Sequence, residues 1–276
     1  MPEGPEIRLA ADRVAKVLVD RSIEKVEFGL PRLERFVKRL IGCRVTAIDT
    51  RGKAMLTRFD NGLTLYSHNQ LYGKWLTTQR PRLPKTGRQL RVGLHTATHS
   101  ALLYSASEIE VLSERGIAMH PFLNRIGPDI LDPGLTTDEI VERLGSLTFR
   151  NRALGGLYLD QAFLAGIGNY LRSEILWAAG VNPAAKPSQL GHAELCVIAK
   201  ETLKISRRSY RTRGVTAPPK QVKQRKMRGK SYEQYRFQVF GRAGLGCYEC
   251  GTAIERRIIG SRNIFVCEYC QSGHSR

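Results

Sequence analysis

The sequence lacks the features of a membrane-spanning or exported protein. No stretch approaches the roughly 18 consecutive apolar residues that a transmembrane helix requires. The start of the chain carries acids where a signal peptide has a basic run and an apolar core. At 276 residues the chain is too long for a miniature disulfide-stapled scaffold, and 42% hydrophobic with 25% charged residues excludes wholesale disorder. We therefore expect a folded protein that stays in the cytosol.

Acidic residues are too few to balance the basic ones. The chain has 44 Lys and Arg against 25 Asp and Glu, a net charge of +19 and a pI near 10.0. This surplus predicts a polyanionic partner, with nucleic acid first and an acidic membrane surface second. Residues 204–236 alone hold twelve basic residues and one acid. Because residues 215–230 contain Pro218-Pro219 and show no apolar period, we predict a mobile basic loop there.

The first half of the chain has the pattern of a β-protein with a helix in front. Apolar residues recur at spacings of three and four over residues 5–18, and Pro5 suits the first turn of a helix. The turn sequence Asp60-Asn61-Gly62 predicts a hairpin. Short runs of β-branched and aromatic residues follow the helix at 23–28, 44–50, 55–59, 63–67, 90–94 and 101–104. The pattern predicts a β-sandwich or barrel with a leading helix.

The second half has a helical pattern. The clusters Gly127-Pro128-Asp129 and Asp132-Pro133-Gly134 mark a boundary or hinge. Beyond them we expect helices from 136 or 137 to 144, and at 156–164, 170–179 and 191–205. The two halves together predict an α+β fold.

Four of the six cysteines form two Cys-x-x-Cys pairs separated by sixteen residues. These are Cys247, Cys250, Cys267 and Cys270, while the other two cysteines stand alone. The spacing is typical of a structural zinc ribbon, with a chance grouping of thiols as the alternative. Four thiolates leave no coordination position for a substrate water, so the Zn²⁺ would hold shape.

An arginine at the tip of the expected ribbon could meet a phosphate. Residues 253–259 and 263–266 alternate like two strands, with Gly260-Ser261-Arg262 at the tip. Arg262 is the candidate, but Arg256 and Arg257 compete on spacing alone, and a solvated surface arginine is the commoner outcome.

The amino terminus reads Met-Pro-Glu-Gly-Pro-Glu. Removal of the initiator Met before a small residue would leave Pro2 with a free secondary α-amine. The pKa of an α-amine is about 7.7 to 8.0, against about 10.4 for Lys, so more of it is nucleophilic at neutral pH. The helix that follows points its positive end at this amine, and Glu3 and Glu6 lie near enough in sequence to exchange protons. An ordinary frayed terminus is the alternative.

Three loops carry weaker signals. Lys53 lies in a turn between two strand-like runs, where a lysine is usually solvated. Residues 68–73 suit a loop tip that enters a base stack, or an edge strand with Leu71 buried. Residues 166–169 suit a phosphate site at a helix start, or a simple turn between helices.

These segments together resemble the formamidopyrimidine-DNA glycosylase and endonuclease VIII family over essentially the whole chain. The resemblance rests on Met-Pro-Glu-Gly-Pro-Glu at the terminus, Thr-Arg-Gly-Lys-Ala at 50–54, Gly-Ile-Gly-Asn-Tyr-Leu-Arg at 166–172 and the four-cysteine ribbon. Within the family, Ser-His-Asn-Gln-Leu-Tyr-Gly at 67–73 and His-Pro-Phe-Leu-Asn-Arg-Ile-Gly-Pro-Asp at 120–129 are closer to bacterial endonuclease VIII.

The resemblance implies a bifunctional DNA glycosylase and AP lyase that removes oxidised pyrimidines from damaged double-stranded DNA. It implies that Pro2 attacks C1′ and forms a Schiff base, and that Glu3 assists sugar opening with Glu6 as helper. It implies that Lys53 contacts phosphate and takes part in β-elimination, and that Arg262 holds a phosphate and promotes δ-elimination. The remaining implied residues bind DNA: Asn169 and Arg125 the phosphates that flank the lesion, and Gln70, Leu71 and Tyr72 the gap left by the everted base.

The resemblance also implies a division of the chain. We expect a catalytic β-sandwich domain at 1–126, a hinge at 127–133, a helix-two-turns-helix domain with the basic loop at 134–236, and a ribbon holding one structural Zn²⁺ at 237–276. We expect a bacterial, cytoplasmic and nucleoid-associated monomer that does not engage a membrane.

Two alternatives differ in activity. A purine-directed glycosylase would act on 8-oxoguanine or formamidopyrimidines, and Gln70-Leu71-Tyr72 argues against it. A noncatalytic zinc-ribbon DNA-binding protein would have lost the amine, and intact Pro2, Glu3 and Lys53 argue against it. The charge of residues 215–230 leaves the substrate preference open.

Overall fold

The computed structural model describes residues 2–272 and divides into two compact units, Met1–Arg125 and Ile126–Arg276. Each unit has its own hydrophobic core. None of the helices in this described part of the chain combines the length and hydropathy of a membrane span. The finer division into a hinge, a helical domain and a ribbon stays a prediction.

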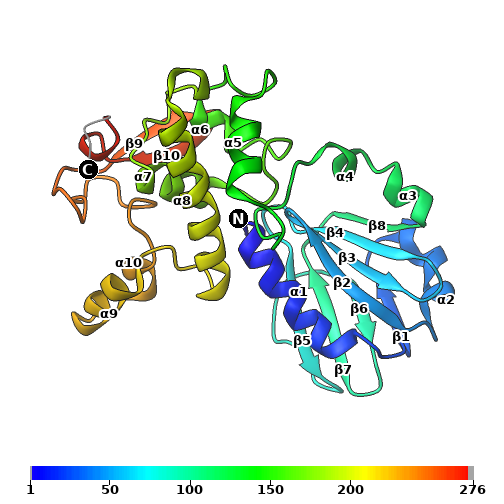
Figure 1. Cartoon of the computed structure of the whole chain (residues 1–276). Coiled ribbons are helices and arrows are strands. Elements are labelled where there is room, and N and C mark those ends of the chain that lie inside the picture. Colours follow the sequence, from blue (N-terminus) through cyan, green and yellow to red (C-terminus); the bar gives the residue numbers. More distant parts are fainter. Residues whose placement is uncertain (1, 273–276) are drawn as a thin grey trace. The chain divides into compact units, whose positions relative to one another are not determined.

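The first unit is a β-sandwich with a leading helix, as expected. Helix α1 (Gly4–Leu18) precedes two four-stranded sheets whose neighbouring strands are all antiparallel. The strands of one sheet are, in order, β2 (Val45–Arg51), β3 (Ala54–Phe59), β4 (Thr64–His68) and β8 (Glu108–Leu112). Those of the other are β1 (Lys25–Phe28), β6 (Leu90–His95), β7 (His99–Tyr104) and β5 (Lys74–Gln79) (Figure 1). Short helices η1 (Pro31–Phe36), α2 (Val37–Leu40), α3 (Glu114–Ala118) and α4 (Pro121–Arg125) complete the unit.

Helix α1 is held by one apolar face. Ile7, Val14 and Leu18 are at most 2% exposed, and they share a core with Leu65 of one sheet and Leu103 of the other. Their spacing places them on one side of a helix, which is the reason that the sequence pattern predicted this element correctly.

Strands β5 and β8 were not predicted. β5 reads Lys-Trp-Leu-Thr-Thr-Gln, in which Trp75, Thr77 and Thr78 suit a strand but polar residues stand at both ends and the alternation is weak. β8 alternates acids with aliphatic residues. Each is an outer strand of its sheet, paired with β7 or β4, and this pairing reinforces a sequence pattern that is weak by itself.

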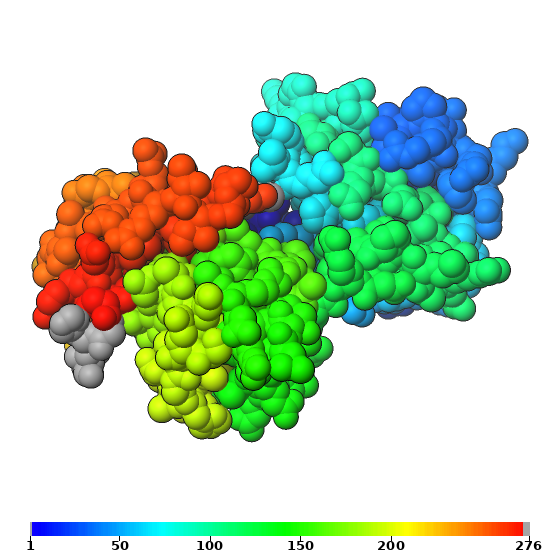
Figure 2. Space-filling model, turned by 90° about the horizontal axis from the view of Figure 1, so that it is seen from above, coloured from blue at the N-terminus to red at the C-terminus, as the bar shows by residue number. Residues whose placement is uncertain are grey.

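The second unit packs helices against a β-hairpin. Helices α5 (Thr137–Gly145), α6 (Leu154–Leu157), α7 (Asn169–Ala178) and α8 (His192–Arg211) share a core with β9 (Glu255–Ile259) and β10 (Arg262–Val266). The space-filling view shows the hairpin, in orange, lying on the surface beside these helices, in green and yellow (Figure 2). Short turns η2 (Pro187–Gln189) and η3 (Tyr269–Gln271) complete the unit.

Two expected elements differ in extent. The helix expected at 156–164 ends at Leu157, because side chains satisfy the backbone that follows: Asp160 accepts from the Ala162 N–H at 2.8 Å, and the Gln161 amide donates to the Ile167 carbonyl at 2.9 Å. The ribbon hairpin turns on Gly260 and Ser261 alone, since Arg262 pairs with Ile259 as the first residue of β10.

The prediction of a basic loop at 215–230 was wrong. Helix α9 (Pro219–Met227) lies there, followed by α10 (Tyr232–Tyr235), both apart from helices α5 to α8 (Figure 1). Arg225 is 7% exposed, donates to the carbonyls of Tyr235 and Phe237 at 3.2 and 3.1 Å, and stacks on the ring of Tyr248 at 3.5 Å. A buried guanidinium, and not an apolar stripe, holds this helix in place. The sequence therefore shows no apolar period from which the helix could be predicted.

Helix α5 offers a test of local stability. The Thr136 hydroxyl accepts from the Glu139 N–H at 3.2 Å, and the Glu139 carboxylate accepts from the Thr136 N–H at 2.8 Å. We expect Thr136→Ala to lower the free energy of unfolding by about 1 kcal/mol, because it leaves a helical N–H without its cap. Urea denaturation measures the difference, with Thr137→Ala, one residue inside the helix, as control. Equal losses in both variants would contradict the capping role.

Candidate active site and nucleic-acid interface

The candidate nucleophile Pro2 directly precedes the first helix. Glu3 is the N-cap residue of α1, with an extended backbone of φ −107° and ψ −176°. Its N–H donates to Glu6 Oε2 at 3.0 Å, and its carbonyl accepts from the Ile7 N–H at 3.1 Å. Glu3 is only 2% exposed. The first turn therefore fixes the backbone beside Pro2 and directs the positive end of the helix dipole toward it.

Lys53 occupies the two-residue turn between β2 and β3. Arg51 pairs with Ala54, and Gly52 has a φ of +61°, which a hairpin turn of this kind requires at its first central residue. The Lys53 side chain is half-buried. Burial lowers the pKa of His68, and the Lys53 charge lowers it further against the opposing effect of the Glu108 carboxylate. Lys53 lies at the end of the sheet where β4 ends, because the next residue, Ala54, pairs with His68.

Residues 69–73 form a tight loop between β4 and β5, which we call the wedge loop. The Gly73 N–H donates to the Asn69 carbonyl at 2.7 Å, and a Cβ on Gly73 would lie 2.5 Å from that oxygen. Gln70 has a left-handed φ of +49°. Leu71 and Tyr72 are 57% and 69% exposed at the tip. The segment is thus a loop, and Leu71 is not buried as the edge-strand alternative requires.

Asn169 and Arg262 lie in the second unit, and a buried arginine links them. Asn169 is the first residue of α7. Arg172, one turn later, has 0% exposure, and its Nη2 donates to Asn169 Oδ1 at 2.7 Å and to the Asn263 carbonyl at 3.0 Å. Its Nη1 donates to the Gly155 carbonyl at 2.7 Å. One guanidinium thus joins the start of α7 to the residue that follows Arg262.

Sequence reasoning missed Arg172, although it ends the Gly-Ile-Gly-Asn-Tyr-Leu-Arg segment. The signal was an arginine within a helix whose neighbours Leu171, Ile175 and Leu176 are all apolar. A charge in such a place is buried and must find several acceptors.

The other hairpin arginines differ from Arg262. Arg262 is exposed beside the turn, as the first residue of β10. Arg257 is engaged by two carboxylates, those of Glu255 at 2.7 Å and Glu268 at 3.2 Å, which together raise its pKa. Arg262 is therefore better placed than Arg257 to meet an anionic ligand. Arg256 is also exposed, but it lies further from the turn, on β9.

The four cysteines of the ribbon converge. Their sulfur atoms all lie within 4.8 Å of one another. Individual Sγ–Sγ distances are 3.8 Å for Cys247–Cys270, 3.4 Å for Cys250–Cys267 and 3.5 Å for Cys250–Cys270. Tetrahedral Zn²⁺ with Zn–S bonds of about 2.3 Å would separate its sulfurs by about 3.8 Å. The geometry therefore fits a four-thiolate metal site.

The candidate residues are divided between the units. Arg125 is the exposed last residue of α4, and it ends the first unit. The first unit also holds Pro2, Glu3, Glu6, Lys53, Gln70, Leu71 and Tyr72, and the second holds Asn169, Arg262, Cys247, Cys250, Cys267 and Cys270.

Similar proteins are found over the whole chain. The N-terminal domain of formamidopyrimidine-DNA glycosylase matches residues 1–107, and the H2TH domain of the same enzyme matches residues 126–218. Endonuclease 8 of Escherichia coli O17:K52:H18 is 49% identical over 271 residues, which cover 98% of this chain and 100% of that protein. Endonuclease 8 of Enterobacter sp. (strain 638) matches with the same identity and coverage.

Solved structures share the fold. Lactococcus lactis Fpg in complex with DNA that contains N7-benzyl-Fapy-dG has a TM-score of 0.80 and 22% identity, covering 98% of this chain and 99% of that one. The same protein with DNA that contains an oxidised pyrimidine gives the same values. With two domain matches in order and relatives that match over their full length, the chain belongs to the formamidopyrimidine-DNA glycosylase and endonuclease VIII family.

Proposed function

We propose that this protein excises oxidised pyrimidines from duplex DNA through a Schiff base on Pro2 and then cuts the strand by β,δ-elimination. The broader class, a DNA glycosylase and AP lyase of base excision repair, follows from the family. The observation that carries the finer proposal is the placement of Pro2 directly before the N-cap of a rigid helix, next to the buried Glu3.

The Pro2 amine is suited to this chemistry. Removal of Met1 frees its nitrogen, which attacks C1′ as the bond from C1′ to the base breaks. Ring opening moves the C1′–O4′ electron pair to O4′, which takes a proton, and leaves an iminium at C1′. The iminium acidifies the C2′ proton. Loss of that proton expels the 3′ phosphate, and a further proton loss expels the 5′ phosphate. Water as nucleophile would stop at an abasic site, so an amine and strand cleavage belong together.

Acidic and basic side chains in the first unit support the proton transfers. Glu3 lies beside Pro2 and is the proposed acid for O4′, while Glu6 holds the Glu3 N–H and helps to position it. Lys53 supplies a cation from a constrained turn, which suits a phosphate contact during β-elimination.

The second unit supplies the proposed phosphate contacts. Arg262 is exposed beside a hairpin turn, and Asn169 begins a helix, where backbone N–H groups favour anions. Arg125 adds a cation from the first unit. The net charge of +19, with α9 among its richest segments, supports a nonspecific DNA affinity that falls steeply with salt.

The wedge loop supports base eversion. An enzyme that reacts at C1′ must take the nucleotide out of the stack. The exposed side chains of Leu71 and Tyr72 can enter the vacated space and offset part of the lost stacking, with Gln70 beside them.

We propose a single Zn²⁺ for the four thiolates. The cation would hold the two ends of the ribbon together, and with four protein ligands it would stabilise the hairpin that presents Arg262. We also propose that the protein acts as a cytoplasmic, nucleoid-associated monomer. Its DNA substrate and basic charge support the association with the nucleoid.

The relatives support two substrate classes. The Lactococcus lactis Fpg complexes contain Fapy-dG as well as an oxidised pyrimidine. The likeness of residues 67–73 and 120–129 to bacterial endonuclease VIII implies pyrimidines, and the 49% identity to Endonuclease 8 supports that likeness. A panel of duplexes that each carry one lesion decides between them: faster release of 8-oxoguanine or formamidopyrimidines than of oxidised pyrimidines would overturn the proposed preference.

The covalent step can be trapped. Borohydride reduction during reaction with a lesion-containing duplex should give a protein–DNA adduct, and Pro2→Gly should abolish it if the ring nitrogen is required. An undamaged duplex is the control. Residual trapping by the variant would mean that another amine substitutes for Pro2.

Substitution of Glu3 should affect base release more than strand cleavage. A positioned acid contributes about 10²- to 10⁴-fold, so we expect Glu3→Gln to slow base release by at least about tenfold. Cleavage of a preformed abasic site should lose less. Asp12→Asn, which makes the same charge change further along α1, is the control. Equal losses in base release and abasic-site cleavage would count against the assigned role.

The ribbon can be tested through its thiolates. Chelation, or Cys267→Ser, should lower DNA affinity and lyase activity together, because Arg262 and the Asn263 carbonyl that accepts from Arg172 lie on the hairpin. Cys196→Ser, on α8 and outside the cluster, is the control and should leave both unchanged. Gel-shift titration and nicking assays measure the two quantities, and full activity without the metal would refute the structural role.

A further inference from the structure

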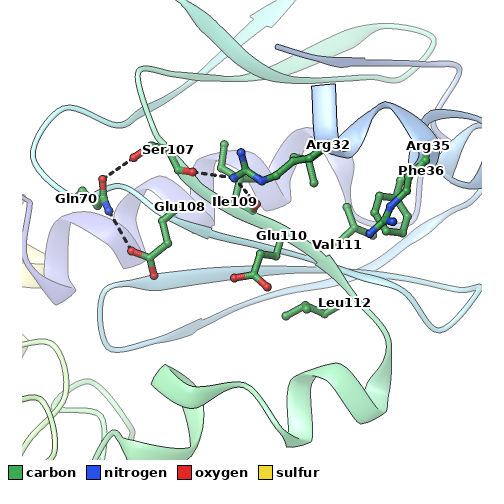
Figure 3. Close-up of a pocket in the computed structure, with 11 residues that line it drawn as sticks. Arg32, Arg35, Phe36, Gln70, Ser107, Glu108, Ile109, Glu110, Val111 and Leu112 are labelled. Carbon is green, nitrogen blue, oxygen red and sulfur yellow. Dashed lines mark hydrogen bonds between the residues drawn. The ribbon is translucent and has the colours of Figure 1, made fainter. Parts of the chain in front are cut away.

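The side chain of Gln70 is held at both ends of its amide. Its Oε1 accepts from the Ser107 hydroxyl at 2.8 Å, and its Nε2 donates to Glu108 Oε2 at 3.1 Å. Glu108 begins β8 and Ser107 directly precedes it, and both line an open pocket of about 540 Å³ (Figure 3). Gln70 itself is exposed, so the contacts leave its outer edge accessible.

The partners allow only one orientation of this amide. An ionised carboxylate only accepts hydrogen bonds, so the atom facing Glu108 must be the Nε2 donor. The hydroxyl of Ser107 then donates to the oxygen at the other end. Rotating the amide by half a turn would bring its oxygen against the carboxylate, which is unfavourable. The direction of the amide is therefore set by the chemistry of its neighbours.

The two partners are themselves fixed. The Tyr66 hydroxyl donates to Glu108 Oε1 at 2.8 Å. Arg32 donates to the carbonyls of Ser107 at 2.9 Å and Ile109 at 3.2 Å (Figure 3). The backbone N–H of Gln70 also donates to His68 Nδ1 at 3.3 Å. Ser107 and Glu108 are thus held by Arg32 and Tyr66, and the backbone of Gln70 is held by His68.

We propose that Ser107 and Glu108 are positioning residues that set the direction of the Gln70 amide, and so determine which base opposite the lesion is accepted. The inference rests on the proposed wedge function of residues 70–72. When the damaged nucleotide is everted, the base opposite it exposes its pairing edge. A glutamine amide presents one donor and one acceptor to such an edge, and a fixed order of the two distinguishes bases.

The test compares variants of the full chain on duplexes that differ only in the base opposite one oxidised pyrimidine. Glu108→Gln keeps the size of the side chain but lets either end of its amide face Gln70, and Ser107→Ala removes the donor. We expect the ratio between the fastest and slowest opposite base to shrink by about tenfold in Glu108→Gln, the scale of one amide–base pair. Ser107→Thr, which keeps the hydroxyl, should restore the selectivity lost in Ser107→Ala.

Two controls separate positioning from general damage. Glu110→Gln makes the same charge change on β8, in the same pocket. The Glu110 carboxylate lies 3.4 Å from His120 Nε2, so this variant should leave the ratio unchanged. Cleavage of abasic single-stranded DNA, which has no opposite base, gives the activity to which each variant is normalised.

The outcomes distinguish this inference from the proposed function. If Gln70→Ala changes the ratio while Glu108→Gln and Ser107→Ala do not, the wedge role stands and the inference is overturned. If Gln70→Ala also leaves the ratio unchanged, both the reading of the opposite base and the inference are overturned. A smaller ratio in Glu108→Gln and Ser107→Ala, with the Glu110→Gln ratio unchanged, supports it.

Discussion

The burial of one face of α1 is the constraint on which the proposed chemistry depends. A free terminus would sample many positions, and an amine that must reach C1′ would then lose much of the advantage of proximity. Ile7, Val14 and Leu18 tie the helix to residues of both sheets, so its first turn has a defined position within the unit. Hydrophobic packing along the whole length of the helix, from Ile7 to Leu18, thereby orients Pro2 and Glu3.

In the second unit a buried charge, and not an apolar helix face, fixes the positions of the candidate residues. A fully buried arginine is costly unless its donors are satisfied, and Arg172 satisfies several through α7, Gly155 and the hairpin. The start of the helix and the hairpin are therefore mutually dependent. Because the cysteines brace the same hairpin, the metal site, Asn169 and Arg262 form one structural group within this unit.

Patterns that are local in sequence were predicted well, and those that depend on distant partners were not. The spacing of α1, the turn at Asp60-Asn61-Gly62 and the cysteine pairs each carry their own signal. Strands β5 and β8 depend on neighbouring strands, and α9 depends on Arg225 meeting the ring of Tyr248. Within the candidate site, the reactive residue types could be named from the sequence. The partners of the supporting residues Arg172 and Glu108 could not be named, because they lie 91 and 38 residues away.

The backbone of the wedge loop is constrained, but the side chains at its tip are not. The bond between Gly73 and Asn69 and the lack of space for a Cβ at Gly73 constrain the backbone, whereas Leu71 and Tyr72 project into solvent and contribute little to the core. Substitutions at these two positions would therefore cost the fold little. These two side chains can therefore change in evolution while the backbone of the loop stays constant, so the proposed contact with the base stack can vary without loss of stability.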